Sequence, residues 1–199
     1  MPKIVDHEQR RAEIAEIAAE LIAEGGLEAA TMREIARRSG FSKGIIEHYF
    51  DDKSELIDAA LGWANQQYFE RVDRATAGFV GLNALRARLK ATVPTTNAVR
   101  SEWKIRLIFW SLAAIDPVLQ KQQAARTRIA VAHFAADLMD AQARGEIGPL
   151  ASVDSAARQV LFTATGLSCA ILHNPRVYNK NVVEQEIERI VASSTAPNQ

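Results

Sequence analysis

Apolar residues recur along most of the chain at the three- and four-residue spacing of a helix that buries one face. The clearest stripe near the start consists of Ile14, Ile17, Ala18, Leu21 and Ile22. Nowhere does the chain sustain the alternation of apolar and polar residues that is typical of a half-buried strand. The pattern therefore predicts an all-α protein.

Prolines, glycines and helix-capping residues divide this pattern into nine predicted helices. They cover about residues 6–24, 31–40, 42–50, 56–77, 83–93, 97–115, 117–144, 152–173 and 181–192. Asp6 and Asp52 are the expected N-caps of the first and fourth helices. Three short helices thus fill a predicted domain of residues 1–54, and the remaining helices form a larger domain of residues 55–199.

The second and third helices are separated by a very short turn. Thr31 and Glu34 form a capping box before the second helix, which closes near Gly40. Ser42 is then placed to cap the third helix only two residues later. Two helices joined by a tight, glycine-containing turn are typical of a helix-turn-helix, whose second helix enters the DNA major groove.

Charge gives this interpretation no general support. The chain of 199 residues has 24 basic and 24 acidic side chains and therefore no net charge. Residues 1–55 contain more acids than bases, 12 against 8. Bulk charge speaks mildly against DNA binding, so the prediction depends on where individual charges stand.

Other classes of protein find little support in the sequence. No apolar run approaches the roughly 18 residues that a membrane-spanning helix requires, and the first residues lack the apolar core of a secretory signal. The single cysteine, Cys169, excludes an internal disulfide. These features predict a cytoplasmic protein. Because no nucleophile motif, phosphate loop or metal-ligand spacing is present, we expect that it is not an enzyme and uses no metal or cofactor.

Residues 31–56, TMREIARRSGFSKGIIEHYFDDKSEL, resemble the DNA-binding segment of the TetR family of bacterial repressors. The matching features are Thr31, the EIA of residues 34–36, Gly40, Ser42, Gly44, the YF of residues 49–50 and Lys53. The segment GIIEHYF, and Lys104 with Trp110, are similar to the betaine-responsive, BetI-type branch. The resemblance implies a homodimeric regulator, most often a repressor, that binds a palindromic double-stranded DNA operator and responds to a small-molecule effector.

The predicted DNA contacts lie on and around the third helix. They are Thr31, Arg33, Ser42, Lys43, Gly44, Glu47, His48, Tyr49 and Lys53. Several of them, including His48, offer hydrogen-bond donors to phosphate, and Arg33 could reach a base edge. The alternative for Arg33 and His48 is a solvated surface position. Glu47 departs from the tyrosine of many family members. Its carboxylate is repelled by phosphate, but it could accept a hydrogen bond from a cytosine amino group.

The expected effector site lies among the helices between about residues 80 and 143. Its predicted residues are Trp103, Leu107, Phe109, Trp110 and Phe134. Because the helix of residues 97–115 is apolar on nearly every side of its second half, we expect it to form the buried axis of the larger domain. Its expected neighbours are Leu85, Leu89, Phe134 and Leu138.

Two cues disagree on the charge of the effector. Aromatic residues attract a quaternary ammonium group through cation–π contacts, although aromatics at helical spacing are more often part of a core. A basic set that only Glu102 opposes favours an anionic effector, or is simply a solvated face. The set consists of Arg86, Arg88, Lys90, Arg100, Lys104 and Arg106.

The last two long helices are the expected dimer contact. Small residues in the segment ATGLSCA permit a close approach of a partner helix, and the final helix offers an apolar face. The predicted interface residues are Gly166, Ala170, Ile187 and Val191. An all-α carrier protein and a helical-bundle enzyme are the alternative functions. The placement of Ser42, Tyr49 and Lys53 disfavours the first, and the absence of a catalytic constellation disfavours the second.

Overall fold

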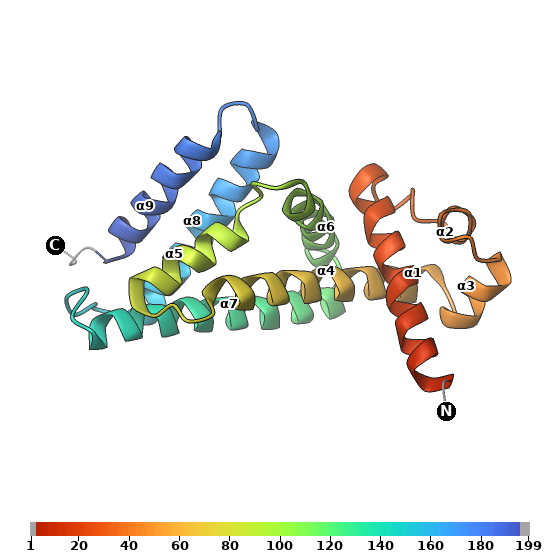
Figure 1. The fold of residues 1–199 in the computed structure, drawn as a ribbon, viewed down its shortest axis with the longest axis horizontal. Helices are drawn as coiled ribbons and strands as arrows, with labels where there is room; N and C mark the ends of the chain where they lie inside the picture. Colours follow the sequence, from red (N-terminus) through yellow and green to blue (C-terminus); the bar gives the residue numbers. More distant parts are fainter. Residues whose placement is uncertain (1–2, 196–199) are drawn as a thin grey trace. The chain divides into compact units, whose positions relative to one another are not determined.

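Helices make up the secondary structure of the described residues. The computed structural model describes the backbone of residues 3–195 and the side chains of residues 7–195. Within that range the elements are α1 (Lys3–Gly25), α2 (Met32–Ser39), α3 (Lys43–Tyr49), α4 (Lys53–Thr76), α5 (Gly81–Thr92), α6 (Asn97–Ala113), α7 (Pro117–Ala143), α8 (Val153–His173) and α9 (Lys180–Thr195). No strand occurs among them, which confirms the all-α prediction (Figure 1).

The observed helices agree with the predicted ones to within three residues at every end. The Asp52 carboxylate accepts a hydrogen bond from the Glu55 N–H at 2.8 Å, so this residue caps α4 as predicted. In contrast, α1 begins at Lys3, ahead of the predicted cap Asp6. The side chain of Asp6 lies outside the described side chains.

The chain divides into two compact units, each with its own core. The N-terminal unit runs to Phe69 and also includes Ser101–Ala114, and the C-terminal unit comprises Glu70–Arg100 and the chain from Ile115 onward. This division falls inside α4. The boundary predicted at residue 54 separates the proposed DNA-binding helices from the rest of the chain, and it stays a prediction.

Most of α6 belongs to the N-terminal unit. Ile105 and Phe109, which are one helical turn apart, are buried in the same core as Ile46 and Leu56. The prediction that this helix forms the axis of the larger domain is therefore wrong. Lys104 and Ser111 of this helix are exposed, and its buried Ile105 and Phe109 face the core of the N-terminal unit.

The C-terminal unit is a bundle of α5, α7, α8 and α9 (Figure 1). α7 packs against α5 and α8, and α9 packs against α8 and α5. Leu85, Leu89, Phe134 and Leu138, which the sequence analysis placed around α6, instead share a core with Ile171 and other residues of α8 and α9. The larger unit is thus built without the central part of α6.

A buried ion pair joins α5 to α7 inside this bundle. The Arg88 guanidinium donates to both carboxylate oxygens of Asp137, at 2.7 and 3.1 Å. The two side chains are 11% and 8% exposed. Two parallel hydrogen bonds are the geometry in which an arginine and a carboxylate interact most strongly.

The start of α5 depends on carboxylates from elsewhere in the unit, because its N-cap residue Val80 makes no side-chain cap. The Gly81 N–H donates to Asp140 at 2.7 Å, and the Leu82 N–H donates to Glu146 at 2.7 Å. Gly81 has a φ of +56°, and a Cβ added to it would lie 2.5 Å from a Glu146 oxygen. Only glycine suits both the backbone conformation and the close carboxylate.

Candidate nucleic-acid interface and effector site

The N-caps of α2 and α3 form as predicted, but the capping box is incomplete, because the Thr31 N–H donates to the Ala29 carbonyl and the Glu34 carboxylate pairs with Arg37. The Thr31 hydroxyl accepts from the Glu34 N–H at 3.1 Å, and the Ser42 hydroxyl accepts from the Ile45 N–H at 3.3 Å. Gly40 ends α2 with a φ of 73°, a left-handed conformation that costs glycine little. Buried Ile35 and Ile46 anchor the two helices in the core of the N-terminal unit.

The opposite side of α3 is exposed. Ile46 is completely buried, whereas Lys43, Gly44, Glu47 and His48 are all exposed. The DNA major groove is wide enough to admit an α-helix, which can present such a polar face to the base edges. Within the helix, the Lys43 ammonium forms an ion pair with the Glu47 carboxylate at 2.7 Å.

Tyr49 at the end of α3 belongs to a group of rings. Its ring centroid lies 4.7 Å from that of His7, on α1, and 5.4 Å from that of His48. The two histidine rings are 6.3 Å apart. The sequence analysis did not identify His7, because nothing in the pattern of α1 shows which of its polar residues approaches α3.

Arg11 of α1 holds the junction between α3 and α4. Its guanidinium lies 4.4 Å from the Phe50 ring centroid, donates to the Tyr49 carbonyl oxygen, and donates to Glu55 at 2.6 Å. Glu55 also accepts from the Asp51 N–H at 2.8 Å. This backbone hydrogen bond and the guanidinium hold the pKa of the Glu55 carboxyl below its ordinary value. Sequence reasoning missed Arg11, because a long-range contact leaves no local signal.

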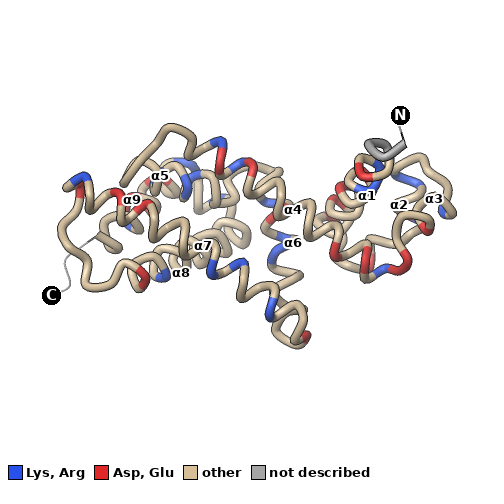
Figure 2. The backbone as a smooth tube through the Cα atoms, turned by 90° about the horizontal axis from the view of Figure 1, so that it is seen from below, with Lys and Arg blue, Asp and Glu red and all other residues tan. Residues whose placement is uncertain are grey.

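Both acidic and basic residues occur along α1, α2 and α3 of the N-terminal unit, as the colours of Figure 2 mark. Lys53, predicted to contact phosphate, forms an ion pair with Glu28 at 3.1 Å. Arg38 bridges α2 to Glu24 of α1 at 2.8 Å, and this hydrogen bond lowers the pKa of Glu24. Arg33 is exposed. The predicted DNA contacts therefore surround α3, but two of their lysines already hold carboxylates.

The predicted effector residues fall into both units. Trp103 and Phe109 are buried in the N-terminal unit, where Leu107 and Trp110 are half-buried. Phe134 is 1% exposed and belongs to the core of the C-terminal unit. The four residues of α6 thus form one candidate effector group in the N-terminal unit. Phe134 belongs instead to the core of the C-terminal unit.

The α6 residues extend into an aromatic cluster around an arginine. The Arg106 guanidinium lies 4.7 Å from the ring centroids of both Tyr68 and Trp103. The Trp103 and Trp110 rings meet edge to face at 5.8 Å. Glu102, next to them in sequence, is buried. Tyr68 was not predicted as a site residue, because it lies on α4, far away in the sequence.

The basic set around residues 86–106 is not an unopposed positive surface. Arg86 pairs with Glu188 at 3.0 Å, and Arg88 pairs with Asp137. The expectation that only Glu102 opposes this set is wrong, because α7 and α9 supply acids that are distant in sequence. Because Arg86 and Arg88 are already paired with acids, these two residues no longer support an anionic effector.

The predicted dimer residues differ in exposure. Gly166 is exposed and Ala170 is half-buried on α8, and Phe162, one turn before Gly166, is 62% exposed. Ile187 and Val191 of α9 are instead 1% and 3% exposed, inside the core of their own unit. Their prediction as contacts to a second subunit does not agree with this burial, since they pack against α5 and α8.

The described residues contain neither a membrane-spanning helix nor a cluster of metal-ligating side chains. None of their helices is long and apolar enough to cross a membrane. No group of three or more histidine, cysteine, aspartate or glutamate side chains in this part of the chain is placed to hold a metal ion.

Comparison with protein families gives two matches that together span most of the chain. Residues 14–60 match bacterial regulatory proteins of the tetR family. Residues 82–196 match the C-terminal domain of BetI-type transcriptional repressors. The first match contains the α2–turn–α3 segment, and the second contains the whole C-terminal bundle.

Individual relatives agree with this assignment. The HTH-type transcriptional regulator BetI of Burkholderia mallei is 33% identical over 161 residues, which are 77% of this chain and 82% of that protein. A transcriptional regulator from Rhodococcus sp. Rha1 has the same fold, with a TM-score of 0.79 at 24% identity over 92% of this chain and 94% of that one. A regulator from Saccharomonospora viridis, solved in complex with choline, has a TM-score of 0.77 at 20% identity, covering 92% of this chain and 96% of that one. The chain therefore belongs to the TetR family of helix-turn-helix transcriptional regulators and has a BetI-type C-terminal domain.

Proposed function

We propose that the protein is a ligand-responsive transcriptional repressor of the cytoplasm, which binds a palindromic operator as a homodimer. The observation that carries this proposal is the exposed polar face of α3, held by the Thr31 and Ser42 caps and the left-handed turn at Gly40. A helix placed in this way contacts base edges in the major groove. A carrier protein or a helical-bundle enzyme would have no reason to expose this polar face of α3.

Within this interface the roles follow from chemistry. Lys43 and Glu47 lie on the exposed face, where a lysine donates to guanine and a carboxylate accepts from cytosine. His48, Tyr49 and Lys53 follow along the chain and offer donors to phosphate oxygens. We therefore assign sequence preference to the first pair and general affinity to the other three residues.

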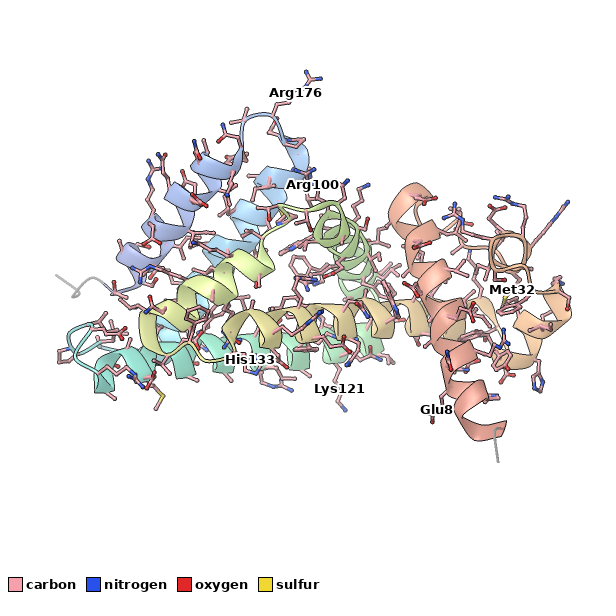
Figure 3. All side chains as sticks on the ribbon, viewed as in Figure 1. Glu8, Met32, Arg100, Lys121, His133 and Arg176 are labelled. Atoms are coloured by element: carbon pink, nitrogen blue, oxygen red, sulfur yellow. The ribbon has the colours of Figure 1, made fainter. Side chains whose placement is uncertain are left out.

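A DNA-binding titration tests this assignment. The natural upstream DNA of the coding sequence serves as the operator probe, and a random duplex of equal length serves as the competitor. Lys43→Ala should weaken operator binding and shift the consensus in a binding-site selection. Lys121→Ala, on α7 (labelled in Figure 3), removes an exposed lysine outside α1–α3 and should change neither. Equal effects of both variants would contradict the proposed docking.

The homodimer is proposed to form through α8. Phe162, Gly166 and Ala170 are spaced four residues apart and form one stripe along the helix. A Cβ added at Gly166 would meet nothing within 4 Å, so the subunit itself does not require glycine there. Because glycine inside a helix costs up to about 1 kcal/mol relative to alanine, the close approach of a second helix supplies a physical reason for it.

Sedimentation tests the dimer. Gly166→Glu places a charge in the proposed contact and should give monomers that bind the operator weakly. Met139→Glu is the matched control, because Met139 is 60% exposed on α7, and this variant should leave the dimer intact. A monomeric wild-type protein at micromolar concentration would overturn the homodimer.

The effector is proposed to be an organic cation that binds at the aromatic cluster of Tyr68, Trp103 and Trp110. The Tyr68 and Trp103 rings already hold the Arg106 guanidinium, which demonstrates their capacity for cation–π contacts. Glu102, the residue before Trp103, is also buried. The match to BetI-type repressors and the choline complex of the Saccharomonospora viridis protein support a quaternary ammonium compound.

The effector would act through α6. Ile105 and Phe109 pack in the core that also contains Ile46 of α3, so a shift of α6 is felt by the proposed recognition helix. A ligand that prefers one arrangement shifts the population toward it. Thermal-shift screening with choline, anionic metabolites and neutral metabolites tests the ligand class. Trp110→Ala should abolish the thermal shift caused by choline, while operator affinity without ligand stays nearly unchanged. Stabilisation of the protein by anions alone would overturn the proposal of a cationic effector.

A further inference from the structure

Almost every basic side chain near the proposed DNA interface holds an acid. Among the described side chains of residues 7–55, the ion pairs include Arg10–Glu13, Arg11–Glu55, Arg37–Glu34, Arg38 with Glu20 and Glu24, Lys43–Glu47 and Lys53–Glu28. Arg33 is the one basic residue of this described segment without such a pair. The interface therefore does not present the unopposed positive charge that general attraction to DNA requires.

Two of these pairs involve lysines that we assign to DNA. The Lys53 Nζ lies 3.1 Å from Glu28 Oε2, and the Lys43 Nζ lies 2.7 Å from Glu47 Oε1. Glu28 stands in the segment between α1 and α2, and its side chain is 93% exposed. A carboxylate so exposed packs against almost nothing, so its contact with Lys53 is its main interaction with the rest of the chain.

We propose that Glu28 and Glu47 compete with DNA for Lys53 and Lys43, and so act as specificity determinants that suppress binding to DNA in general. The inference rests on the proposed DNA-binding function. DNA docking then exchanges the Lys53–Glu28 ion pair for a contact of Lys53 with phosphate, and the Lys43–Glu47 ion pair for contacts with base edges. A random duplex presents phosphates, which repel both carboxylates, without the matching base contacts. An operator adds base contacts that offset this exchange.

Ion release gives the proposal a distinctive signature. A lysine that neutralises a phosphate releases the counterions condensed there, so affinity falls steeply with salt. A carboxylate that loses its lysine takes up a cation from solution, which cancels part of that release. The salt dependence of binding should therefore be shallower than the number of lysine–phosphate contacts alone would give, and removal of the carboxylate should steepen it.

The test compares Glu28→Gln with the wild-type protein on a random duplex over a range of salt concentrations. Exposed ion pairs are weak, so the loss of one in each of two subunits should raise the affinity roughly threefold to tenfold at low salt. The salt slope should steepen at the same time. Glu16→Gln is the matched control, because this exposed acid of α1 has the same charge but no contact with either lysine. It should give a smaller gain than Glu28→Gln.

A double-variant cycle isolates the contact with Lys53. In a Lys53→Ala background, Glu28→Gln should give no more gain than the Glu16→Gln control, because the competed lysine is absent. The inference is overturned if Glu28→Gln and Glu16→Gln give equal gains, or if the gain persists in the Lys53→Ala background. Failure of the proposed function has a different outcome, in which the wild-type protein binds neither its upstream DNA nor the random duplex.

Discussion

The two units of the chain use the same ionic chemistry at different depths. In the N-terminal unit, the side chains of Lys43 and Glu47 are 62% and 49% exposed. In the C-terminal unit, those of Arg88 and Asp137 are 11% and 8% exposed. Water competes with the exposed pair, which contributes about 0–1 kcal/mol, whereas loss of one buried partner leaves an uncompensated charge. The Lys43–Glu47 pair can therefore change partners, while the Arg88–Asp137 pair holds the fold.

The largest difference between the units is expected from single-partner deletions. Arg88→Ala should lower the free energy of unfolding by about 3–5 kcal/mol, because the Asp137 carboxylate stays buried without its guanidinium. Lys43→Ala, in the exposed pair, should change it by less than about 1 kcal/mol. Urea denaturation followed by circular dichroism measures both. Similar losses in the two variants would remove the distinction between the units.

A glycine in each unit gives the second contrast. Gly81→Ala should cost about 1–3 kcal/mol, because the φ of +56° and the Glu146 carboxylate both oppose a Cβ. Gly62, inside α4 of the N-terminal unit, has open space around its Cβ position. Gly62→Ala should therefore stabilise by about 0.5–1 kcal/mol. Thermal unfolding checks the sign of each change, and a stable Gly81→Ala protein would show that the carboxylates do not fix the start of α5.

Serine caps of equal chemistry should separate stability from function. Ser42 caps α3 by accepting from the Ile45 N–H at 3.3 Å, and Ser152 caps α8 by accepting from the Ser155 N–H at 3.2 Å. Alanine at either position should cost about 1 kcal/mol of stability. Operator affinity should fall only with Ser42→Ala, since this cap lies next to the proposed DNA face. An operator titration with the two variants at matched folded fraction decides this.

Sequence reasoning succeeded where the signal is local. The caps at Thr31, Ser42 and Asp52 need only a side chain and an N–H two or three residues away, and all three form. Helix ends follow from the same short-range chemistry, so they were predicted to within three residues. The resemblance carried by residues 31–56 is also a local pattern, and the family comparison confirms it.

The failures concern contacts between distant segments. The apolar stripe of α6 shows that Ile105 and Phe109 are buried, but nothing in the stripe names the core that buries them. The apolar face of α9 was equally visible, yet Ile187 packs inside its own unit. Arg88 looked unopposed because Asp137 lies on another helix. The spacing of apolar residues along the sequence identifies the buried face of a helix. Only the folded structure shows which residues that face packs against.

Lowering the pH should reduce the stability of the N-terminal unit by a small amount that depends on Glu55. The Asp51 N–H and the Arg11 guanidinium hold the Glu55 pKa below its ordinary value of 4.5 in the folded protein. Above that value the carboxylate is ionised in both the folded and unfolded states, so its full contribution to stability is present. As the pH falls from 4.5 toward the folded pKa, the unfolded chain takes up the proton first, and the contribution is lost. Glu55→Gln removes this titration, so its unfolding temperature should fall less than that of the wild-type protein between about pH 7 and about pH 3.5. Glu16→Gln, an exposed acid of α1 outside this junction, should follow the wild-type curve, and a flattening as large as that of Glu55→Gln would assign the effect to general charge instead.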